Sequence, residues 1–208
     1  MLWAGRLPTL RGMAAAAGQT RIREAGANDL DVIAGIFAHY VTTSVSTFEE
    51  TPPTVREWEN KLSGISELGL PFLVVESGGG GGRGAGGGRG VVAGYAYAGP
   101  WRPKPAYRHT VEDSVYLAPG WTGRGLGRML LTALLAHCAC AGARQMIAVI
   151  ADSGADASVA LHRACGFTDA GRLAGVGFKH GRWLDTLLLQ RGLTGGPAEG
   201  RQVPGGGY

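Results

Sequence analysis

The chain has 208 residues, which is long enough to bury one complete hydrophobic core and short for two domains. Its formal net charge of +4 is too small to indicate nucleic-acid binding by itself, and it suits a phosphorylated ligand equally well. No apolar run approaches the roughly 20 residues that span a bilayer, and the three cysteines (Cys138, Cys140 and Cys165) are odd in number and fall in expected helices, so the sequence predicts no membrane segment, disulfide framework or metal site.

The two ends of the chain differ in composition from the part between them. Residues 1–19 carry Arg6, Arg11 and several alanines but no acidic residue. This composition leaves three alternatives open, which are an organelle-targeting segment, a disordered extension, or translation that begins at Met13. Residues 192–208 are rich in glycine and are expected to be a disordered tail. We therefore expect one domain over residues 20–191, in the cytoplasm unless residues 1–19 act as a targeting segment.

A strand and two helices are expected at the start of this domain. Residues 20–24 alternate as a short strand does. Asn28 is the predicted N-cap of the first helix, and Thr54 with Glu57 matches the capping box of a second helix over residues 55–62. The apolar residues of the first helix recur on one face, and they are Leu30, Ile33, Ile36, Phe37 and Tyr40.

Residues 72–76 and 91–98 are predicted to be neighbouring strands, with a glycine-rich insert over residues 77–90 where a tight turn would be enough. The insert is interpreted as an expanded hairpin loop, because doubling the length of a flexible loop costs only about 0.6 kcal/mol. No helix start follows it, so a phosphate-binding role is not favoured.

The rest of the domain alternates between strands and helices. A strand is expected over residues 110–117, and a helix begins near Gly125, with Gly142 at its C-terminal end. Further elements are a strand over residues 145–151, a helix over 158–165 and a strand over 186–190. The order of the elements predicts an α/β fold with a mixed sheet.

A glycine-rich turn separates the strand that ends at Leu117 from the helix that follows. The start of a helix leaves several N–H groups unpaired and carries a partial positive charge. Glycines at positions 123, 125 and 127 let an anion approach those groups, and Arg124 and Arg128 add charge. The Gly-Lys-Ser/Thr ending of a Walker A loop is missing. The turn is therefore predicted to hold a pyrophosphate.

This strand, turn and helix resembles the coenzyme A site of the GCN5-related N-acetyltransferase (GNAT) superfamily. The superfamily pattern Arg/Gln-x-x-Gly-x-Gly/Ala is met by Gly125 and Gly127, while Thr122 stands at the Arg/Gln position. Other stretches resemble the phosphinothricin acetyltransferases and their methionine sulfoximine/sulfone acetyltransferase relatives, and these are residues 95–102, 106–107, 110–116, 161–162, 166–167 and 177–183. The resemblance covers most of residues 20–191.

The resemblance implies a GNAT acyl-CoA N-acyltransferase fold, in which helices flank a mixed central sheet. It implies transfer of acetyl from acetyl-CoA to the amine of a small amino-acid-like substrate, without a metal or a covalent enzyme intermediate. Related enzymes are commonly homodimers, and no nucleic acid or membrane partner is implied.

Two catalytic residues follow from the resemblance. Glu112 matches the glutamate taken as the general base, and a base is needed because an ammonium has no lone pair with which to attack a thioester. His162 matches a histidine beside the coenzyme sulfur, where it would protonate the thiolate or relay a proton.

The resemblance also assigns the binding residues. Main-chain groups of Val115 and Leu117 would hold the pantetheine arm, and a strand N–H would polarise the thioester carbonyl. Ala155 stands where the family often has an asparagine, which predicts weaker coenzyme binding. The full coenzyme set is Val115, Leu117, Thr122, Gly123, Arg124, Gly125, Leu126, Gly127, Arg128, Ala155 and Ser158. The substrate set is Phe48, Arg102, Lys104, Tyr107, Thr110, Val111 and Tyr116, of which Arg102 and Lys104 suit an anionic acceptor.

Two other functions stay open on the sequence. One is acetylation of a different amine, such as another amino acid, a polyamine or a protein N-terminus. The other is a non-enzymatic RNA-binding or regulatory protein, which the Arg-Gly tract and the basic pI of about 9.2 would suit.

Overall fold

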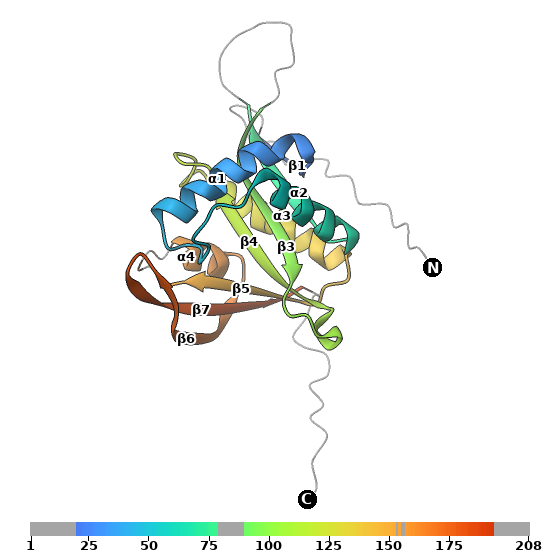
Figure 1. The fold of residues 1–208 in the computed structure, drawn as a ribbon. Coiled ribbons are helices and arrows are strands. Elements are labelled where there is room, and N and C mark those ends of the chain that lie inside the picture. The colour runs from blue at the N-terminus through green and yellow to red at the C-terminus, as the bar shows by residue number, and fades with distance from the viewer. Residues whose placement is uncertain (1–19, 79–89, 153, 155–156, 194–208) are drawn as a thin grey trace, which may run out of the picture.

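A computed structural model describes residues 20–78, 90–152, 154 and 157–193 (Figure 1). The expectations for residues 1–19, for residues 79–89 of the insert and for residues 194–208 lie outside this part of the chain, as does Ala155.

Within the described residues, seven strands form one mixed sheet. Its order is β1 (Thr20–Glu24), β2 (Phe72–Ser77), β3 (Val91–Pro100), β4 (Thr110–Leu117), β5 (Gln145–Ala151), β7 (Arg182–Gly192) and β6 (Thr168–Lys179). The pair β4 and β5 is parallel, and every other neighbouring pair is antiparallel. The predicted α/β fold with a mixed sheet is therefore confirmed.

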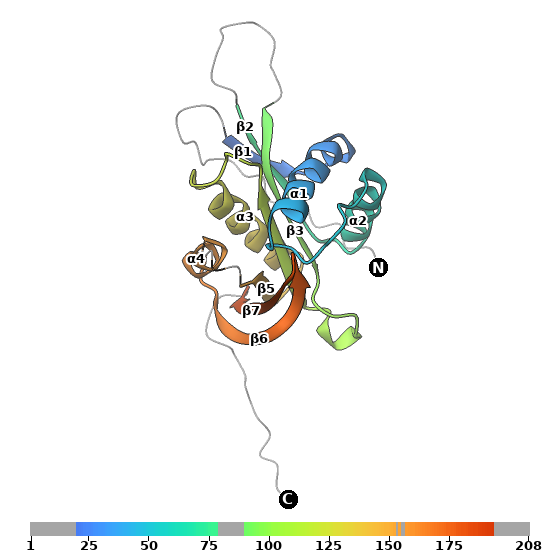
Figure 2. The same cartoon turned by 60° about the vertical axis from the view of Figure 1, so that its left-hand side comes forward.

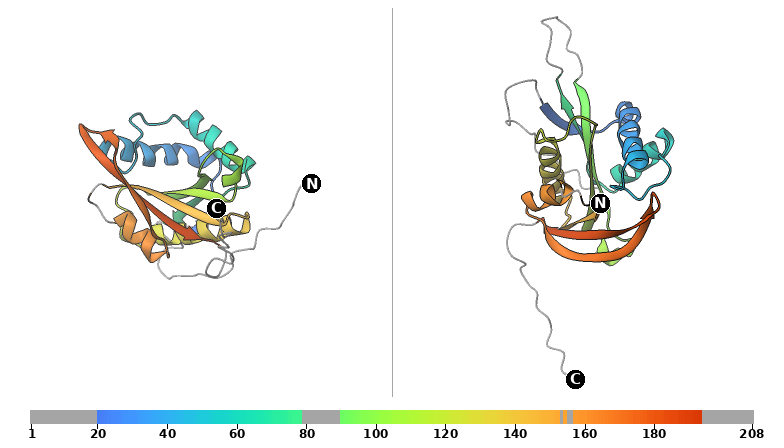
Figure 3. Two further views of the ribbon diagram at one scale, coloured as in Figure 1. Left: turned by 90° about the horizontal axis from the view of Figure 1, so that it is seen from below. Right: turned by 90° about the vertical axis from the view of Figure 1, so that its left-hand side faces the viewer.

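Four α-helices cover the two faces of this sheet, among the residues that the structure describes. Figures 2 and 3 show α1 (Leu30–Thr43) and α2 (Val55–Glu67) on one face and α3 (Leu126–Cys140) and α4 (Ala157–Ala164) on the other. Short 3₁₀ helices lie at Ala27–Asp29 and Pro105–Tyr107. None of the described helices is long and apolar enough to cross a membrane.

Each face of the sheet has its own apolar core, because alternate side chains of a strand point to opposite faces. Val111 of β4 packs with α3 on one face, in a cluster that contains Leu130 and Leu134. Tyr116 of the same strand packs on the other face, edge-on to Phe37 of α1 at a centroid distance of 5.1 Å. The strand β4 thus presents different residues to the two helical layers.

The predicted capping box of α2 is confirmed, and the predicted cap of α1 is wrong. The Thr54 N–H donates to the Glu57 carboxylate at 2.7 Å, and the Glu57 N–H donates to the Thr54 hydroxyl at 3.3 Å. Before α1, the capping carboxylate belongs to Asp29 and accepts from the Gly26 N–H at 2.8 Å. The chain makes a 3₁₀ turn through Asn28, so the asparagine lies inside the turn.

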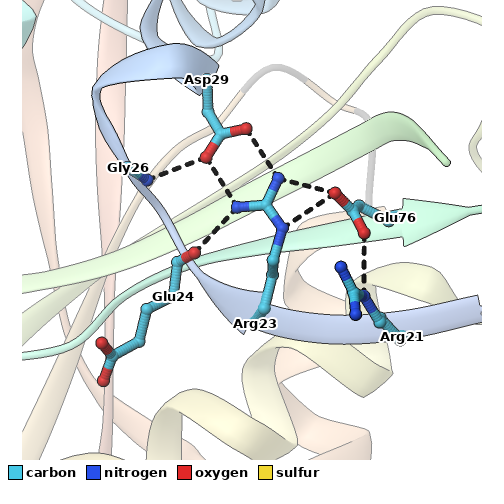
Figure 4. Close-up of polar contacts among 6 residues, drawn as sticks. All are labelled: Arg21, Arg23, Glu24, Gly26, Asp29 and Glu76. Carbon is cyan, nitrogen blue, oxygen red and sulfur yellow. Dashed lines mark hydrogen bonds and ion pairs between the residues drawn. The ribbon is translucent and has the colours of Figure 1, made fainter. Parts of the chain in front are cut away.

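Asp29 is also part of an ion-pair cluster that ties the start of α1 to the sheet (Figure 4). The Arg23 guanidinium of β1 donates to both oxygens of Asp29 at 2.7 Å and to Glu76 of β2 at 2.6 and 2.8 Å. Arg21 donates to the other Glu76 oxygen at 2.9 Å. Glu76 and Asp29 are nearly buried, so their pairing with Arg23 offsets part of the cost of removing both carboxylates from water.

The last hairpin is the largest departure from the predicted elements. The sequence predicted a single strand over residues 186–190, whereas the structure has the two long strands β6 and β7. The turn between them has His180 at φ +49° and Gly181 at φ +75°, and two positive φ angles are typical of a two-residue hairpin turn. The strand β6 was missed because most of it is exposed and rich in glycine, so it lacks apolar alternation.

Candidate active site

The strands β4 and β5 pair over only three positions and then run apart (Figure 1). Thr110, Val111 and Glu112 pair with β5, and the next residue along β4 is Asp113. Beyond this fork lies a cavity of about 440 Å³. Its lining comprises residues 113–117 of β4, 148–151 of β5, the glycine turn and α4, together with Tyr40 and Ser46. Among the described residues, main-chain groups on the β5 side of β4 therefore have no strand partner beyond Glu112 and can bind an extended polar ligand.

The predicted main-chain contacts and the glycine turn both lie on this cavity. Val115 and Leu117 line it, and so do Thr122 and Arg128. Tyr40 was not predicted as a site residue, yet it lines the cavity, and its hydroxyl donates to the Leu117 carbonyl oxygen at 2.8 Å. The cavity therefore extends from the N-terminus of α3 to the fork between the two strands.

The three predicted glycines have different physical roles. Gly123 and Gly125 have φ angles of +75° and +77°, and a Cβ at either position would have open space around it. Glycine is favoured there because of the left-handed backbone, and the missing side chain leaves the turn accessible. Gly127 is buried instead, and a Cβ there would lie 3.3 Å from a methyl carbon of Leu161. Its hydrogen serves the packing of α3 against α4.

Two other residues of the predicted coenzyme set do not line the cavity with their side chains. The Arg124 guanidinium lies over the Trp121 ring, 4.7 Å from its centroid. Leu126 is buried in the core beneath the turn, so only its main chain can face a ligand. Arg128 lines the cavity and is the cation that the turn offers to an anion there, among the described residues. Ser158 of α4 also lines the cavity.

His162 of α4 lines the cavity and is held by two hydrogen bonds. Its Nε2 lies 2.9 Å from Oδ2 of Asp113, and its Nδ1 lies 2.7 Å from the Ser158 carbonyl oxygen. Both side chains of the pair are buried. Burial lowers the pKa of His162, but the hydrogen bond and the charge of Asp113 raise it, and the pKa is above its ordinary value.

Asp113 is a second site residue that the sequence reasoning missed, after Tyr40. It follows the predicted base in β4, so it lies on the opposite face, in line with Val111 and Val115 of the α3 core. A charged residue on the apolar side of a strand is unusual, because burial of a carboxylate is costly without a partner. That position in the strand pattern was a signal for a buried polar contact.

Glu112 is half-buried on the other face of β4, the face that carries Tyr116. Burial raises the pKa of Glu112, the charge of Asp113 raises it further, and the charge of Arg102 acts in the opposite direction. The two predicted catalytic residues therefore lie at the same fork. Glu112 is on one face of β4, and His162 reaches the fork from α4 on the other face.

Three of the predicted substrate residues, which are Tyr116, Phe48 and Val111, lie in three different places. Tyr116 lines the cavity, and burial raises its pKa above the ordinary range. Phe48 lies in the loop between α1 and α2, with its ring against Gly177 of β6. Val111 is only 2% exposed within the core, so its side chain is not available to a substrate.

The other four predicted substrate residues lie on the connection between β3 and β4 or at its end, beside Glu112 and outside the cavity lining. They are Arg102, Lys104, Tyr107 and Thr110. Lys104 and Tyr107 are exposed, and the Arg102 guanidinium lies 4.6 Å from the centroid of the Trp101 ring. The carbonyl oxygen of Thr110 accepts from the Trp101 N–H at 3.2 Å, which holds this connection against the start of β4.

The tip of the β6–β7 hairpin contacts the loop between α1 and α2, beside the same fork. The Lys179 ammonium is 3% exposed and donates to the Thr47 carbonyl oxygen at 2.9 Å, and His180 bonds to the Ser44 carbonyl oxygen at 3.3 Å. Burial lowers the pKa of Lys179. These contacts fix the loop that carries Ser46 and Phe48.

Comparison with known proteins matches this chain to a family. The model of the "Acetyltransferase (GNAT) family" matches residues 36–167. A phosphinothricin N-acetyltransferase from Alcaligenes faecalis is 47% identical over 169 residues, which cover 81% of this chain and 80% of that protein. An L-methionine sulfoximine/L-methionine sulfone acetyltransferase from Pseudomonas paraeruginosa is 38% identical over 83% of this chain and 94% of that protein.

A solved structure agrees with these matches. It is a GNAT superfamily phosphinothricin acetyltransferase from Sinorhizobium meliloti in complex with acetyl-CoA, with a TM-score of 0.75 and 42% identity. The match covers 88% of this chain and 96% of that chain. The resemblance inferred from the sequence is confirmed by these matches.

Proposed function

The chain belongs to the acetyltransferase (GNAT) family, and from that premise we propose that it moves acetyl from acetyl-CoA to the amine of a small amino-acid-like substrate. The observation that carries the proposal is the cavity between β4 and β5, which has a helix N-terminus at one end and acid–base groups at the other. Attack is direct, in a ternary complex, without a covalent enzyme intermediate.

In this proposal the two ends of the cavity bind different parts of the coenzyme. The pyrophosphate of the coenzyme binds the N–H groups of Gly123 and Gly125 with the charge of Arg128 beside it. The pantetheine arm then follows β4, where the main-chain groups of Val115 and Leu117 that lie beyond the pairing with β5 hold it as a neighbouring strand would. This course brings the thioester to the fork, where a β4 N–H polarises its carbonyl.

Glu112 acts as the general base on the acceptor ammonium. A base works best when its pKa is near the operating pH, and burial raises the pKa of Glu112 in that direction. The proton leaves the amine on the Glu112 face of β4, while the departing sulfur lies towards His162 on the other face.

The acceptor is a small amino acid or analogue that carries an anionic group. Arg102 and Lys104 lie on the connection next to Glu112, where they bind a carboxylate or a phosphinate, sulfone or sulfoximine oxygen. The named relatives act on phosphinothricin, methionine sulfoximine and methionine sulfone, which fit this description.

The proposal is tested by measuring coenzyme release from acetyl-CoA. Phosphinothricin, methionine sulfone and methionine sulfoximine are compared in parallel with ordinary amino acids, a polyamine and a peptide with a free N-terminus. Saturable turnover of the three analogues supports the proposal. Turnover of only the polyamine or the peptide would replace the proposed acceptor, and no turnover with any amine would overturn the function.

We also propose that the enzyme is a homodimer formed through the β6–β7 hairpin. Apolar side chains are exposed there: Leu173, Val176 and Phe178 of β6 and Trp183 of β7, which is 70% exposed. An exposed apolar patch of this kind is typical of a protein interface. Sedimentation should give a dimer for the wild-type chain and for Val32→Ser on α1, and a monomer for Trp183→Ser. A monomeric wild-type chain would contradict the proposal.

A further inference from the structure

Asp113 and His162 form a buried pair at the fork of β4 and β5. Asp113 is the first residue of β4 beyond the three positions that pair with β5, and His162 reaches it from α4. The His162 ring also meets Phe167 edge-on, with centroids 5.0 Å apart. Its orientation is therefore fixed from three sides.

Two oxygens make the short contacts of the His162 ring and decide its protonation, while the Ser158 hydroxyl lies farther away, 3.5 Å from Nδ1. A carbonyl oxygen and a carboxylate oxygen can only accept hydrogen bonds. Since Nδ1 faces the Ser158 carbonyl and Nε2 faces Asp113, each nitrogen carries a hydrogen when Asp113 is ionised. This places a positive imidazolium beside the negative carboxylate, and the raised pKa of His162 agrees with it.

The described titratable groups whose pKa values the charge of Asp113 raises include, besides His162, Glu112 and Tyr116 of β4 and Cys138 of α3, and none of these three is a cation. Burial raises the pKa of Cys138 to about 12, with a smaller contribution from Asp113, so its thiol is neutral. Oδ1 of Asp113 has no hydrogen-bond partner among the described residues, so His162 is the group that balances this carboxylate there.

We propose, on the basis of the proposed acetyl transfer, that Asp113 is a positioning residue which keeps His162 protonated and oriented, so that His162 delivers its Nε2 proton to the departing thiolate of coenzyme A. Before this step, Glu112 accepts one proton of the ammonium and passes it to solvent, the freed amine bonds to the acetyl carbon, and Glu112 then accepts the second proton of that nitrogen. The oxyanion re-forms the carbonyl, the C–S bond breaks with its electron pair on sulfur, and the Nε2 proton leaves its hydrogen bond to Asp113 and bonds to sulfur. Neutral His162 keeps its Nδ1 hydrogen bond and regains a proton from solvent.

The magnitudes explain why the histidine needs this partner. With an ordinary pKa near 6.5, only about one in ten histidines is protonated at pH 7.5, whereas a nearby carboxylate typically raises the pKa by one unit or more. An ordinary thiol has a pKa of about 8.5, so proton transfer from the imidazolium to the thiolate stays favourable as long as the pKa of His162 is below that value.

The experiment compares the wild-type chain with Asp113→Asn and with Asp169→Asn. Asp169 is a matched control, because it is an exposed aspartate that pairs at 3.0 Å with Arg163, the residue after His162. The pKa of the His162 ring is measured by NMR in the protein saturated with coenzyme A. The pH profile of kcat is measured with acetyl-CoA and methionine sulfone.

In Asp113→Asn the raising carboxylate is gone, so the pKa of His162 should fall by about one unit or more. The acid form is then lost at a lower pH, and the alkaline limb of kcat should move down by the same amount while KM for acetyl-CoA stays within about twofold. Asp169→Asn should match the wild type in both measurements. In a His162→Gln background, Asp113→Asn should add little further loss of kcat, because the two residues act as one unit.

A profile of Asp113→Asn that keeps the wild-type alkaline limb, with a uniform loss at every pH, would overturn the proposal and leave Asp113 a structural residue. An unchanged pKa of His162 would overturn it as well. The NMR titration does not depend on turnover, so the two failures are distinguishable. If no acceptor is acetylated while the pKa of His162 still falls, the proposed function and the proton delivery are wrong, although the pairing holds.

Discussion

The environment of Glu112 separates it from the exposed glutamates of the chain. It is half-buried next to Asp113, and its pKa is raised by burial first and by the Asp113 charge second. A base must be deprotonated to act, so activity should fall as the pH drops through the pKa of Glu112. Because this pKa is raised, the acidic limb should lie above the ordinary value of about 4.3 for glutamate.

Replacement of this base tests the assignment. Glu112→Gln should lower kcat by about 10²- to 10⁴-fold and remove the acidic limb, because the amide cannot accept the amine proton. Binding of acetyl-CoA, measured by calorimetry, should be unchanged. Glu59→Gln on the exposed side of α2 is the control and should behave as wild type. Equal kcat profiles for Glu112→Gln and wild type would remove Glu112 from the mechanism.

The two kinds of glycine in the turn should respond differently to a methyl group. Gly125→Ala forces a left-handed backbone on alanine, which costs about 1–2 kcal/mol, and shifts the N–H groups that face the anion. KM for acetyl-CoA should rise about tenfold with little change in kcat. Gly127→Ala meets the flexible ends of Leu161 and Leu117, so KM should change less than twofold. Steady-state kinetics checks both, and equal KM values for the two variants would argue against an anion at the turn.

At the scale of elements, the Arg23 cluster joins β1, β2 and the start of α1 (Figure 4). Arg23→Ala removes the guanidinium that donates to both Glu76 and Asp29 in a nearly buried place, and loss of one partner of such a pair typically costs about 3 kcal/mol. Urea unfolding measures this loss. Arg163→Ala removes an exposed pair and should cost less than about 0.5 kcal/mol. Equal costs would show that the cluster adds no more than a surface pair.

The same cluster makes stability depend on pH in a defined direction. Hydrogen bonds from Arg23 hold the pKa of Glu76 below its ordinary value. A carboxylate with a lowered pKa in the folded state stabilises the fold above its unfolded pKa, and this contribution is lost as the pH falls through the folded value. The difference in unfolding free energy between wild type and Arg23→Ala should therefore shrink below about pH 4.

Most elements were predictable because each carries a local signal. The strands β1, β4 and β5 have the predicted bounds, since alternation or an apolar run bounded by turn residues marks a half-buried or buried strand. The strand β6 has neither signal, because it is exposed at the edge of the sheet. The helix α2 runs to Glu67, past the predicted end at residue 62, because a capping box marks only where a helix begins.

Within the site, the glycine turn was predictable because it is contiguous in sequence. The contact between Asp113 and His162 was not, since it joins residues 49 positions apart and depends on which face of β4 each side chain takes. The place of Arg102 near Glu112 likewise follows from how the β3–β4 connection folds back, which composition does not reveal. The roles of Glu112, Arg102 and Lys104 stay predictions until the variants are measured.

At the scale of the whole molecule, three residue pairs between β4 and β5 join the part of the sheet made by β1 to β4 to the part made by β5, β7 and β6. A coenzyme that fills the fork would supply contacts that the parted strands do not make with each other. The ligand would then bridge the two parts of the sheet. At a free coenzyme concentration of a hundred times its dissociation constant, it would stabilise the folded state by about 2.7 kcal/mol.

Hydrogen exchange can detect this bridging of β4 and β5 by the coenzyme. Addition of coenzyme A should slow exchange of main-chain amides on both strands of the fork, in residues 113–117 of β4 and in residues 148–151 of β5. The exchange rates of β1 and β2 should stay unchanged. Protection of β4 alone would mean that the coenzyme binds β4 without bridging to β5. Protection on both sides would mean that the coenzyme links β4 and β5 where the two strands no longer pair, so that its binding also stabilises the sheet.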